Sequence, residues 1–351
     1  MQQLIPEIAV RGYRVDLLQV RGHGPYLEQL PANVRCIDLG HHHTYSCLPA
    51  LVRYLRSQRP SLMLSDKDRV NRTALFARWL SRTHTPLIFR LGTTVSLNLA
   101  SRGAFERWLQ RNSIGKLYRF ARKVLVPSQG VREDISRYTN LAAERIQVVP
   151  SPAIADDLFN QTQPLPEHPW FQAHEIPVIL GVGELGARKD FSTLLRAFAL
   201  LRQERPCRLV IIGRGKLREH LLTEAASLGV EADVDLPGFV ESPYPYMAHA
   251  DLFAFSSRWE GLGLVLVEAL ALGTNVVSTD CPSGPSEILH GGRFGTLVPV
   301  GDAEAMAQAL AKTLDAPKPT DFLQQASRPY TVSVATDAYL DAMGLPTTYS
   351  P

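Results

Sequence analysis

The sequence has few cysteines and no long apolar segment. Its four cysteines, Cys36, Cys47, Cys207 and Cys281, show no C-x-x-C spacing, which argues against a zinc site and against a disulfide framework. A reducing cytoplasm is therefore the expected compartment. No apolar run is long enough to span a bilayer, and the chain does not open with a basic and then apolar signal segment. An integral membrane protein is not expected.

The sequence also offers little for a metal ion. His41, His42 and His43 are consecutive, so they cannot all face one ion, and a solvated loop is the favoured interpretation. Asp233 and Asp235 form a D-x-D pattern, which binds metals in some enzymes, but the start of a solvated strand is favoured here. We therefore expect neither a metal nor a resident cofactor.

What is present fits a two-domain globular protein with an uneven charge. The chain has 351 residues, of which 45% are hydrophobic and 20% charged, enough for two cores. Residues 1–158 hold 23 Lys and Arg against 12 Asp and Glu, a net charge of +11, whereas residues 159–351 hold 14 against 22, a net charge of −8. This asymmetry indicates an anionic partner for the first half, namely a membrane surface, a polyphosphate or a nucleic acid. Charge that serves only solubility is the alternative.

The first half alternates strands with helices, which is typical of a parallel, doubly wound sheet. Strands are predicted at 14–20, 34–39, 61–64 and 86–90, and helices at 48–59 and 72–81. Residues 101–123 then form a basic stretch in which seven cations face one acid, Glu106, and alternate with apolar residues. This stretch suits an amphipathic surface on anionic lipid. The alternative is a helix with a basic outer face whose apolar side is core.

The second half opens with a strand and a glycine turn at 177–186. Its Gly181, Gly183 and Gly186 satisfy G-x-G-x-x-G, the dinucleotide fingerprint, so an oxidoreductase has to be considered. The next strand, 208–213, ends in Arg214 instead of the acid that would hold an adenosine ribose. Only a phosphorylated dinucleotide tolerates this arginine, so the oxidoreductase would depend on NADP.

The stretch 259–275, W-E-G-L-G-L-V-L-V-E-A-L-A-L-G-T-N, follows an apolar strand predicted at 251–257 and reads as a loop and a helix. Gly261 and Gly263 keep the loop free of Cβ atoms, so backbone amides at the helix start can approach an anion such as phosphate. Glu260 and Glu268 flank this anion site, and carboxylates suit the hydroxyl pairs of a sugar. The ligand that these residues imply is a nucleotide-sugar.

The segment from Glu260 to Glu268, E-G-L-G-L-V-L-V-E, resembles the Glu-x7-Glu motif of the GT4 family of retaining glycosyltransferases. Other segments resemble that family in the same order, over nearly the whole chain; they are 122–131, 145–152, 189–198, 236–240, 283–288 and 292–298. The resemblance implies the α/β GT-B fold, in which two Rossmann-like, doubly wound parallel-sheet domains face a cleft. Domains are expected at 1–158 and 176–328, joined by a linker at 159–175, with a C-terminal helix at 329–344 that packs back on the first domain.

The resemblance also implies a function and a site. The function is the transfer of a sugar from a UDP- or GDP-sugar to a glycan or lipid-linked glycan acceptor in polysaccharide or lipopolysaccharide biosynthesis. Neither a metal nor a nucleic-acid partner is expected. The expected location is the cytoplasm or the inner face of the cytoplasmic membrane. Lys189, which the family places on the donor diphosphate, and Glu260, which would orient the sugar, are the expected catalytic residues, and Glu268 would hold the ribose. The full set of expected donor-binding residues is Gly183, Arg188, Lys189, Gly213, Gly238, Phe239, Glu260, Gly261, Leu262, Gly263, Leu264 and Glu268.

Three departures from the family leave an alternative open. Family members begin with a strand and a Gly-rich loop, whereas Met1 falls here inside the first helix, which ends at Arg11-Gly-Tyr13. Either the true start lies further upstream, or the protein lacks an interior strand of the first domain and part of its cleft. Gly92 lies where many relatives carry a histidine that contacts the donor sugar, and Glu184 lies where an arginine is more common. The alternative is a catalytically degenerate GT-B subunit that acts as a binding partner.

Overall fold

The computed structural model describes residues 2–21, 27, 29–100, 102–173 and 175–348, which form two compact units. The first consists of Met1–Pro152 with Val332–Pro351, and the second of Ala153–Thr331. The division therefore lies before the boundary predicted at 158. The reason is that the Ala153 amide donates to the carbonyl of Tyr330 over 2.9 Å, and Ile154 and Leu158 are buried in the core of the second unit.

The stretch predicted as a linker, 159–175, also contributes to the second unit. It contains helix α7 (Pro169–Ala173), whose Phe171 is buried in the same core. The last helix, α15 (Val332–Met343), belongs to the first unit, as expected for residues 329–344. There Arg90 donates its Nε to the Tyr339 hydroxyl over 2.8 Å, and Tyr339 is buried.

The first unit contains the predicted parallel strands, but in two sheets. One sheet pairs β1 with β2, and the other has the order β3-β4-β5-β6. In the described ranges no hydrogen-bonded ladder joins β1 to β3, although Leu18 of β1 and Met63 of β3 pack against one apolar cluster that includes Leu55. The strands are β1 (Val15–Gln19), β2 (Val34–Asp38), β3 (Met63–Asp66), β4 (Leu87–Arg90), β5 (Lys123–Val126) and β6 (Ile146–Val148).

Helices cover β4 and β5 of the first unit, whose residues are mostly buried on both faces of the sheet. Phe89 on β4 is fully buried and packs edge-on against Tyr118 with the ring centroids 4.8 Å apart. The helices are α1 (Leu4–Val10), α2 (Leu48–Gln58), α3 (Asp68–Ser81), α4 (Val95–Leu99), α5 (Ala104–Leu117) and α6 (Gln129–Thr139). Among the helices of the described part of the chain, none has the length and the hydropathy that crossing a bilayer requires.

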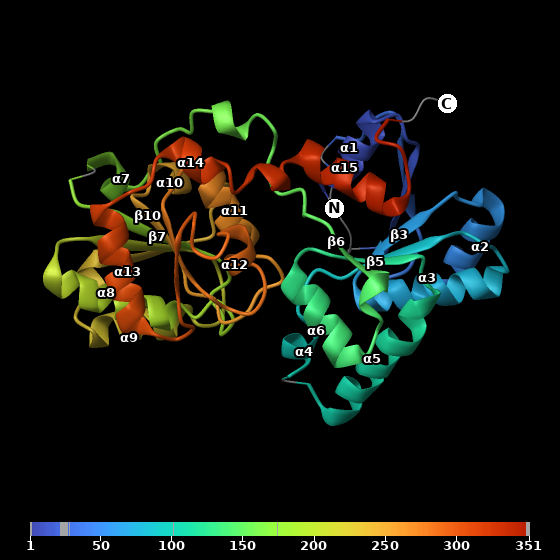
Figure 1. Ribbon diagram of the computed structural model, residues 1–351, viewed down its shortest axis with the longest axis horizontal. Helices are drawn as coiled ribbons and strands as arrows, with labels where there is room; N and C mark the ends of the chain where they lie inside the picture. The colour runs from blue at the N-terminus through green and yellow to red at the C-terminus, as the bar shows by residue number, and fades with distance from the viewer. Residues whose placement is uncertain (1, 22–26, 28, 101, 174, 349–351) are drawn as a thin grey trace. The chain divides into compact units, whose positions relative to one another are not determined.

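The second unit is built on one parallel sheet of six strands with the order β12-β11-β10-β7-β8-β9. From β7 the chain winds outward in one direction through β8 and β9, and then in the other through β10 to β12. Figure 1 labels the two central strands, β7 and β10, which pair with each other. This is the doubly wound Rossmann order, and its topological switch point lies between β7 and β10. The strands are β7 (Val178–Val182), β8 (Arg208–Ile212), β9 (Val234–Gly238), β10 (Leu252–Phe255), β11 (Val276–Thr279) and β12 (Thr296–Val298).

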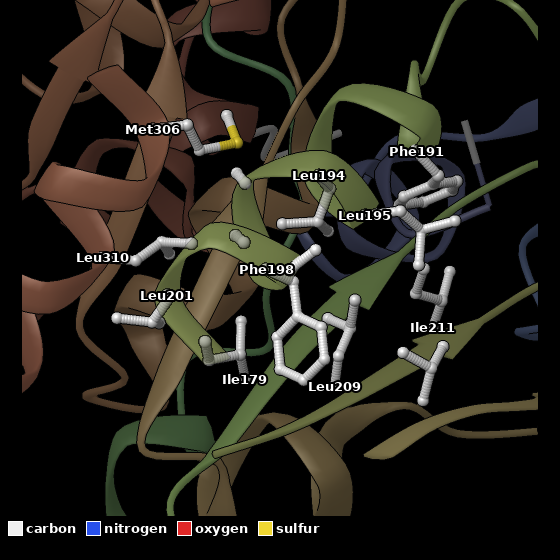
Figure 2. Packing of buried hydrophobic residues seen from close by; sticks show 14 of the residues in the cluster. Ile179, Phe191, Leu194, Leu195, Phe198, Leu201, Leu209, Ile211, Met306 and Leu310 are labelled. Atoms are coloured by element: carbon white, nitrogen blue, oxygen red, sulfur yellow. The ribbon is translucent and has the colours of Figure 1, made fainter. Parts of the chain in front are cut away.

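Both faces of this sheet are covered by helices. On one face Phe198 of α8 packs over Ile179 and Leu209, with Met306 and Leu310 of α13 beside it (Figure 2). Truncating one such buried side chain to alanine lowers the free energy of unfolding by about 2–5 kcal/mol. This packing stabilises the sheet whose ends carry the loops of the site. The first face carries α8 (Phe191–Glu204), α9 (Arg218–Ser227) and α13 (Ala303–Asp315), and the second carries α7, α10 (Tyr244–His249), α11 (Leu264–Ala271), α12 (Pro285–Ile288) and α14 (Thr320–Gln324).

Candidate functional site

The candidate site lies at the carboxyl ends of β7 and β10, on either side of the switch point of the second unit. The loop after β7 carries Arg188 and Lys189, and the loop after β10 carries Glu260. These strands are direct neighbours in the sheet. Parallel strands end at one edge of a sheet, and ligands of doubly wound folds bind at that edge beside the switch point. The topology therefore brings together residues that are far apart in the sequence.

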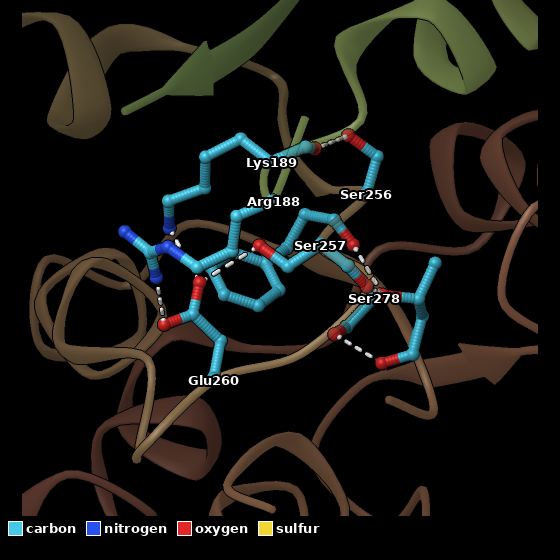
Figure 3. Close-up of polar contacts among 8 residues, drawn as sticks. Arg188, Lys189, Ser256, Ser257, Glu260 and Ser278 are labelled. Atoms are coloured by element: carbon cyan, nitrogen blue, oxygen red, sulfur yellow. Dashed lines mark hydrogen bonds and ion pairs between the residues drawn. The ribbon is translucent and has the colours of Figure 1, made fainter. Parts of the chain in front are cut away.

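Arg188, Lys189 and Glu260 form one ion cluster. Lys189 Nζ lies 2.9 Å from Glu260 Oε1, and Arg188 Nη1 lies 2.6 Å from Oε2 of the same carboxylate. Figure 3 shows both cations reaching this one acid from the same side. Lys189 and Glu260 are 7% and 6% exposed, so their attraction acts with little water between them. The predicted pair of catalytic residues is in direct contact.

Three neighbours fix the position of Lys189. Its Nζ lies 4.5 Å from the centre of the Phe255 ring, and its carbonyl accepts a hydrogen bond from Ser256 Oγ over 2.7 Å. A Cβ at Gly183 would lie only 2.8 Å from Lys189 Cε, so this glycine leaves the space that the lysine side chain needs. Burial lowers the pKa of Lys189, while the charge of Glu260 opposes that shift. The ammonium group is thus held as a buried cation by its carboxylate partner.

Ser257 fixes the position of Glu260. Its Oγ donates to Glu260 Oε1 over 2.9 Å (Figure 3). Its own carbonyl accepts from Thr279 Oγ1 over 2.6 Å. Phe255, Ser256 and Ser257 were not predicted as site residues. Their one signal in the sequence is their place at the carboxyl end of a buried strand, where functional side chains gather in parallel sheets.

A second bridge joins the two loops beside the cluster. The Arg258 amide donates to the Arg188 carbonyl over 2.8 Å, and the Arg258 guanidinium lies 3.2 Å from Asp190 Oδ2. Asp190 precedes α8 in a left-handed conformation with φ of 47°. The loops after β7 and β10 are therefore joined by both backbone and side-chain contacts, which fixes the position of Arg188 and Lys189 relative to Glu260.

The glycine loop leads directly into α11, as predicted. Gly263 has φ of +95° and precedes the helix, and a Cβ there would lie 3.1 Å from Phe255 Cζ. Gly263 and Lys189 therefore pack on the same ring. Gly261 and Leu262 are buried in the loop, with the Gly261 carbonyl accepting from Ser283 Oγ over 2.8 Å. The helix begins at Leu264, and the Leu266 amide donates to the Gly263 carbonyl over 2.9 Å. The positive end of the helix dipole at this start suits an anion.

Glu268 lies about one turn into α11, which begins at Leu264. Its carboxylate is partly buried, and within the described residues no group donates a hydrogen bond to it. Burial raises its pKa to about 7, and the charge of Lys189 acts in the opposite direction. Glu268 is therefore near the ion cluster with its oxygens available to a donor group.

Gly213 and Gly238 lie at the carboxyl ends of β8 and β9, at the same edge of the sheet as the ion cluster. The Gly213 amide donates to the Gly238 carbonyl over 2.8 Å, and a Cβ at Gly213 would lie 1.8 Å from the Gly183 carbonyl oxygen. Beside them the Arg214 guanidinium lies 5.0 Å from the centre of the Phe239 ring, which is 60% exposed. The exposed ring presents a flat apolar surface next to the turns.

The two metal patterns of the sequence do not form metal sites. His41, His42 and His43 are exposed. The carboxylates of the D-x-D pattern have separate partners, since Asp233 lies 2.7 Å from Arg202 Nε and Asp235 lies 2.9 Å from His168 Nε2. Across the described ranges, no three His, Cys, Asp or Glu side chains are grouped as metal ligands.

Two family models match the chain in succession. The model of the "Glycosyl transferase 4-like domain" matches residues 1–152, and that of "Glycosyl transferases group 1" matches residues 176–316. The chain belongs to the GT4-type glycosyltransferases. The two models cover the two units, which confirms the family that the Glu-x7-Glu segment indicated.

Relatives of known name agree with this family. The chain is 34% identical over 248 residues to N-acetylgalactosamine-N,N'-diacetylbacillosaminyl-diphospho-undecaprenol 4-alpha-N-acetylgalactosaminyltransferase of Campylobacter jejuni, covering 71% of this chain and 65% of the relative. It is 38% identical over 136 residues to the lipopolysaccharide core biosynthesis glycosyltransferase LpsE of Rhizobium meliloti, covering 39% of each. The chain thus spans less than two thirds of the length of these relatives.

A solved structure confirms the GT-B fold of this family member. HepE of Anabaena, crystallised in complex with UDP, superimposes with a TM-score of 0.75 at 18% identity, covering 98% of this chain and 96% of that one. The match extends over both units, each with the parallel α/β sheets described above. Within the comparisons nothing supports an NADP-dependent oxidoreductase or a degenerate subunit.

Proposed function

We propose that this protein transfers a sugar from a UDP- or GDP-sugar to a glycan or lipid-linked glycan acceptor in polysaccharide or lipopolysaccharide biosynthesis. The observation that carries the proposal is the buried cluster of Lys189, Arg188 and Glu260 at the switch point, beside the start of α11 and Glu268. The names of the relatives from Campylobacter jejuni and Rhizobium meliloti support the acceptor class.

The cations account for the departure of the nucleotide. As the bond between the sugar and the diphosphate breaks, negative charge grows on the departing phosphate oxygens. Lys189 and Arg188 lie on one side of the start of α11, whose amides favour an anion. A well-placed donor of this kind contributes about 3–4 kcal/mol to the stability of a transition state. Since fixed cations supply this charge, we propose that the transfer needs no divalent metal and no resident cofactor.

The two acids and the exposed ring account for recognition of the donor. Glu260, held by Ser257, would accept from hydroxyls of the sugar. Glu268 would accept from the two ribose hydroxyls, because its carboxylate receives no hydrogen bond within the described chain. The turns at Gly213 and Gly238, with Phe239 beside them, would hold the base. Membership of the family makes retention of the anomeric configuration the expected outcome, and the cytoplasm is the compartment we propose.

The test is donor binding and transfer in the presence of EDTA. Calorimetry with UDP and GDP identifies the nucleotide, and a panel of the corresponding sugars identifies the donor. Lys189→Ala and Glu268→Ala should each weaken binding and slow transfer. Undiminished activity in both variants would discard the assigned roles, loss of activity in EDTA that Mg²⁺ restores would discard metal independence, and nucleotide binding without turnover by any donor would discard the catalytic proposal.

A further inference from the structure

Ser283 lies in the loop between β11 and α12 and has a strained backbone. Its φ of 72° is in the left-handed region, which glycine favours and which a residue with a Cβ adopts at a cost. Such strain persists where the surrounding contacts enforce it, and it gathers at functional sites. One such contact is a hydrogen bond of 2.8 Å from Ser283 Oγ to the Gly261 carbonyl. The strained residue is therefore attached to the glycine loop that leads into α11.

The residues on either side of Ser283 contact the same glycine loop. Gly284 has a φ of +100°, and a Cβ there would lie only 1.9 Å from the Leu262 carbonyl oxygen. This glycine lets the carbonyl approach its Cα closely. On the other side of Ser283, the Pro282 carbonyl accepts from the Glu260 amide over 3.4 Å. Three consecutive residues of the loop after β11 thus contact three consecutive residues of the loop after β10.

These contacts decide where two amides of the glycine loop point. Across the described residues no peptide bond is cis, and in a trans peptide the N–H and the C=O point in opposite directions. Because the carbonyls of Gly261 and Leu262 face the loop after β11, the amides of Leu262 and Gly263 face away from it. In the described chain, neither amide donates a hydrogen bond to a protein acceptor. Both residues are buried, and a buried amide without an acceptor is rare in folded proteins. An acceptor supplied by a ligand would satisfy both.

The two amides lie beside the ion cluster. A Cβ at Gly263 would lie 3.1 Å from Phe255 Cζ, and Lys189 Nζ lies 4.5 Å from the centre of the same ring. Gly263 is left-handed, and the next residue, Leu264, is helical. Successive amides in such a sequence of conformations form a concave nest that binds anions. The acceptor that fits these amides next to a lysine is a phosphate oxygen.

We propose that Ser283 is a positioning residue for the donor diphosphate. Its hydroxyl acts through the Gly261 carbonyl: it fixes the plane of the peptide between Gly261 and Leu262, and so it directs the Leu262 amide at a phosphate oxygen. Without the hydroxyl this peptide plane can rotate, and the amide loses the fixed direction on which stabilisation of a charged group depends. The inference rests on the proposed function, because it names the residue that orients the anion site used there.

Ser283→Ala and Ser283→Gly test the proposal, because both remove the hydroxyl. The affinity for the diphosphate that the protein binds, UDP or GDP, should fall about tenfold in each variant, since a hydrogen bond to a charged group loses its alignment. The affinity for the matching nucleoside, uridine or guanosine, should stay unchanged, because a nucleoside carries no phosphate. Calorimetry of the full chain measures both affinities. Their ratio is the readout, since a general loss of structure would lower both alike.

Urea denaturation separates the hydroxyl from the backbone strain. Glycine adopts a φ of 72° without the cost that a Cβ brings. Ser283→Gly should therefore unfold at a higher urea concentration than Ser283→Ala, although both bind the diphosphate weakly. If Ser283→Gly bound the diphosphate like the wild type and only Ser283→Ala bound it weakly, the backbone and not the hydroxyl would be responsible, and the proposal would fail.

The matched control is Ser227→Ala. Ser227 Oγ also donates to a backbone carbonyl over 2.8 Å, that of Glu224, but it lies at the end of α9, which leads to the opposite edge of the sheet. Its affinity ratio should equal that of the wild type. An unchanged ratio in both Ser283 variants, or an equal fall in the control, would overturn the inference while the proposed function stands. If the wild type bound neither diphosphate, the proposed function itself would fail, and the inference with it.

Discussion

Lys189 Nζ lies 2.9 Å from Glu260 Oε1 in a buried ion pair that joins the loops after two neighbouring strands. Such a pair contributes little net stability, because removing both charges from water costs about as much as their attraction returns. Removing only one of the two charges strongly lowers stability, since the remaining charge stays buried without its partner. Its position at the switch point of the sheet is what the proposed role of Lys189 at the donor diphosphate requires.

Lys189→Ala tests whether this cation acts on the departing diphosphate. We expect kcat to fall about a hundredfold, because one donor to the growing negative charge is lost. UDP should also bind more weakly. Steady-state kinetics and calorimetry measure the two effects.

The control for this variant is Lys312→Ala, which removes an exposed lysine from the same unit. Its kinetics should equal those of the wild type. A Lys189→Ala enzyme with a normal kcat and a raised KM would show that the lysine binds donor and transition state equally, which contradicts a role in catalysis.

Ser257→Ala tests the positioning of Glu260. The variant removes the hydrogen bond of 2.9 Å to Oε1 and leaves the two ion pairs of the carboxylate in place. We expect a loss of about 1 kcal/mol in the free energy of unfolding and a fall in kcat/KM of about tenfold. Chemical denaturation and kinetics measure these losses.

Comparison with Glu260→Gln decides whether Ser257 acts through Glu260. In the double variant Ser257→Ala with Glu260→Gln, the serine change should have almost no further effect on kcat/KM, because residues that act as a unit are not additive. Losses that add fully would show that Ser257 contributes independently of Glu260.

Much of the second unit could be predicted because its signals are local. The run Val178–Val182 is apolar and is followed by a glycine, so the strand and its turn can be predicted from the sequence. The glycine loop before α11 can be predicted in the same way. Lys189 and Glu260 were predicted one by one, each from its own loop. The contact between them was not predicted, because it depends on β7 and β10 being neighbours. The pairing of strands that are far apart in the chain cannot be inferred from a local sequence pattern.

The same limit applies to burial. The helical period of 101–123 showed an apolar and a basic side on α5, but not which side faces the core. Phe105 is exposed and Ile114 is buried because the two side chains, nine residues apart, point in opposite directions from α5. Ser257 was missed for a similar reason: a serine at the end of an apolar strand becomes significant only when a carboxylate lies within 2.9 Å of it.

If Glu268 holds the ribose as proposed, we expect donor binding to depend on pH. Burial raises its pKa to about 7, so the carboxyl group is largely protonated at pH 6 and ionised at pH 8. An ionised carboxylate accepts from both ribose hydroxyls, whereas the protonated form accepts less well. UDP affinity of the wild type relative to Glu268→Gln should therefore rise between about pH 6 and about pH 8. Calorimetry across this range measures the ratio, from which the ionisation of UDP itself cancels.

Stability should change in the opposite direction. The pKa of Glu268 is raised above its ordinary value of 4.5, so between these two values the native state binds a proton that the unfolded chain has released. The free energy of unfolding of the wild type relative to Glu268→Gln should thus fall as the pH rises from about 5 to about 8. Urea denaturation across this range measures it, and a difference independent of pH would show that Glu268 is ionised throughout.

Gly213→Ala tests the packing of the turns at the edge of the sheet. A Cβ at Gly213 would lie 1.8 Å from the Gly183 carbonyl oxygen, so the turns after β7 and β8 must separate to admit it. We expect a loss of more than about 3 kcal/mol in the free energy of unfolding, together with loss of UDP binding. The control is Gly186→Ala in the turn after β7, where the nearest atom to a new Cβ would be 3.8 Å away. It should change stability by less than about 1 kcal/mol. Equal effects of the two substitutions would mean that the turns tolerate a side chain at Gly213, and that the close contact between them does not shape the donor site.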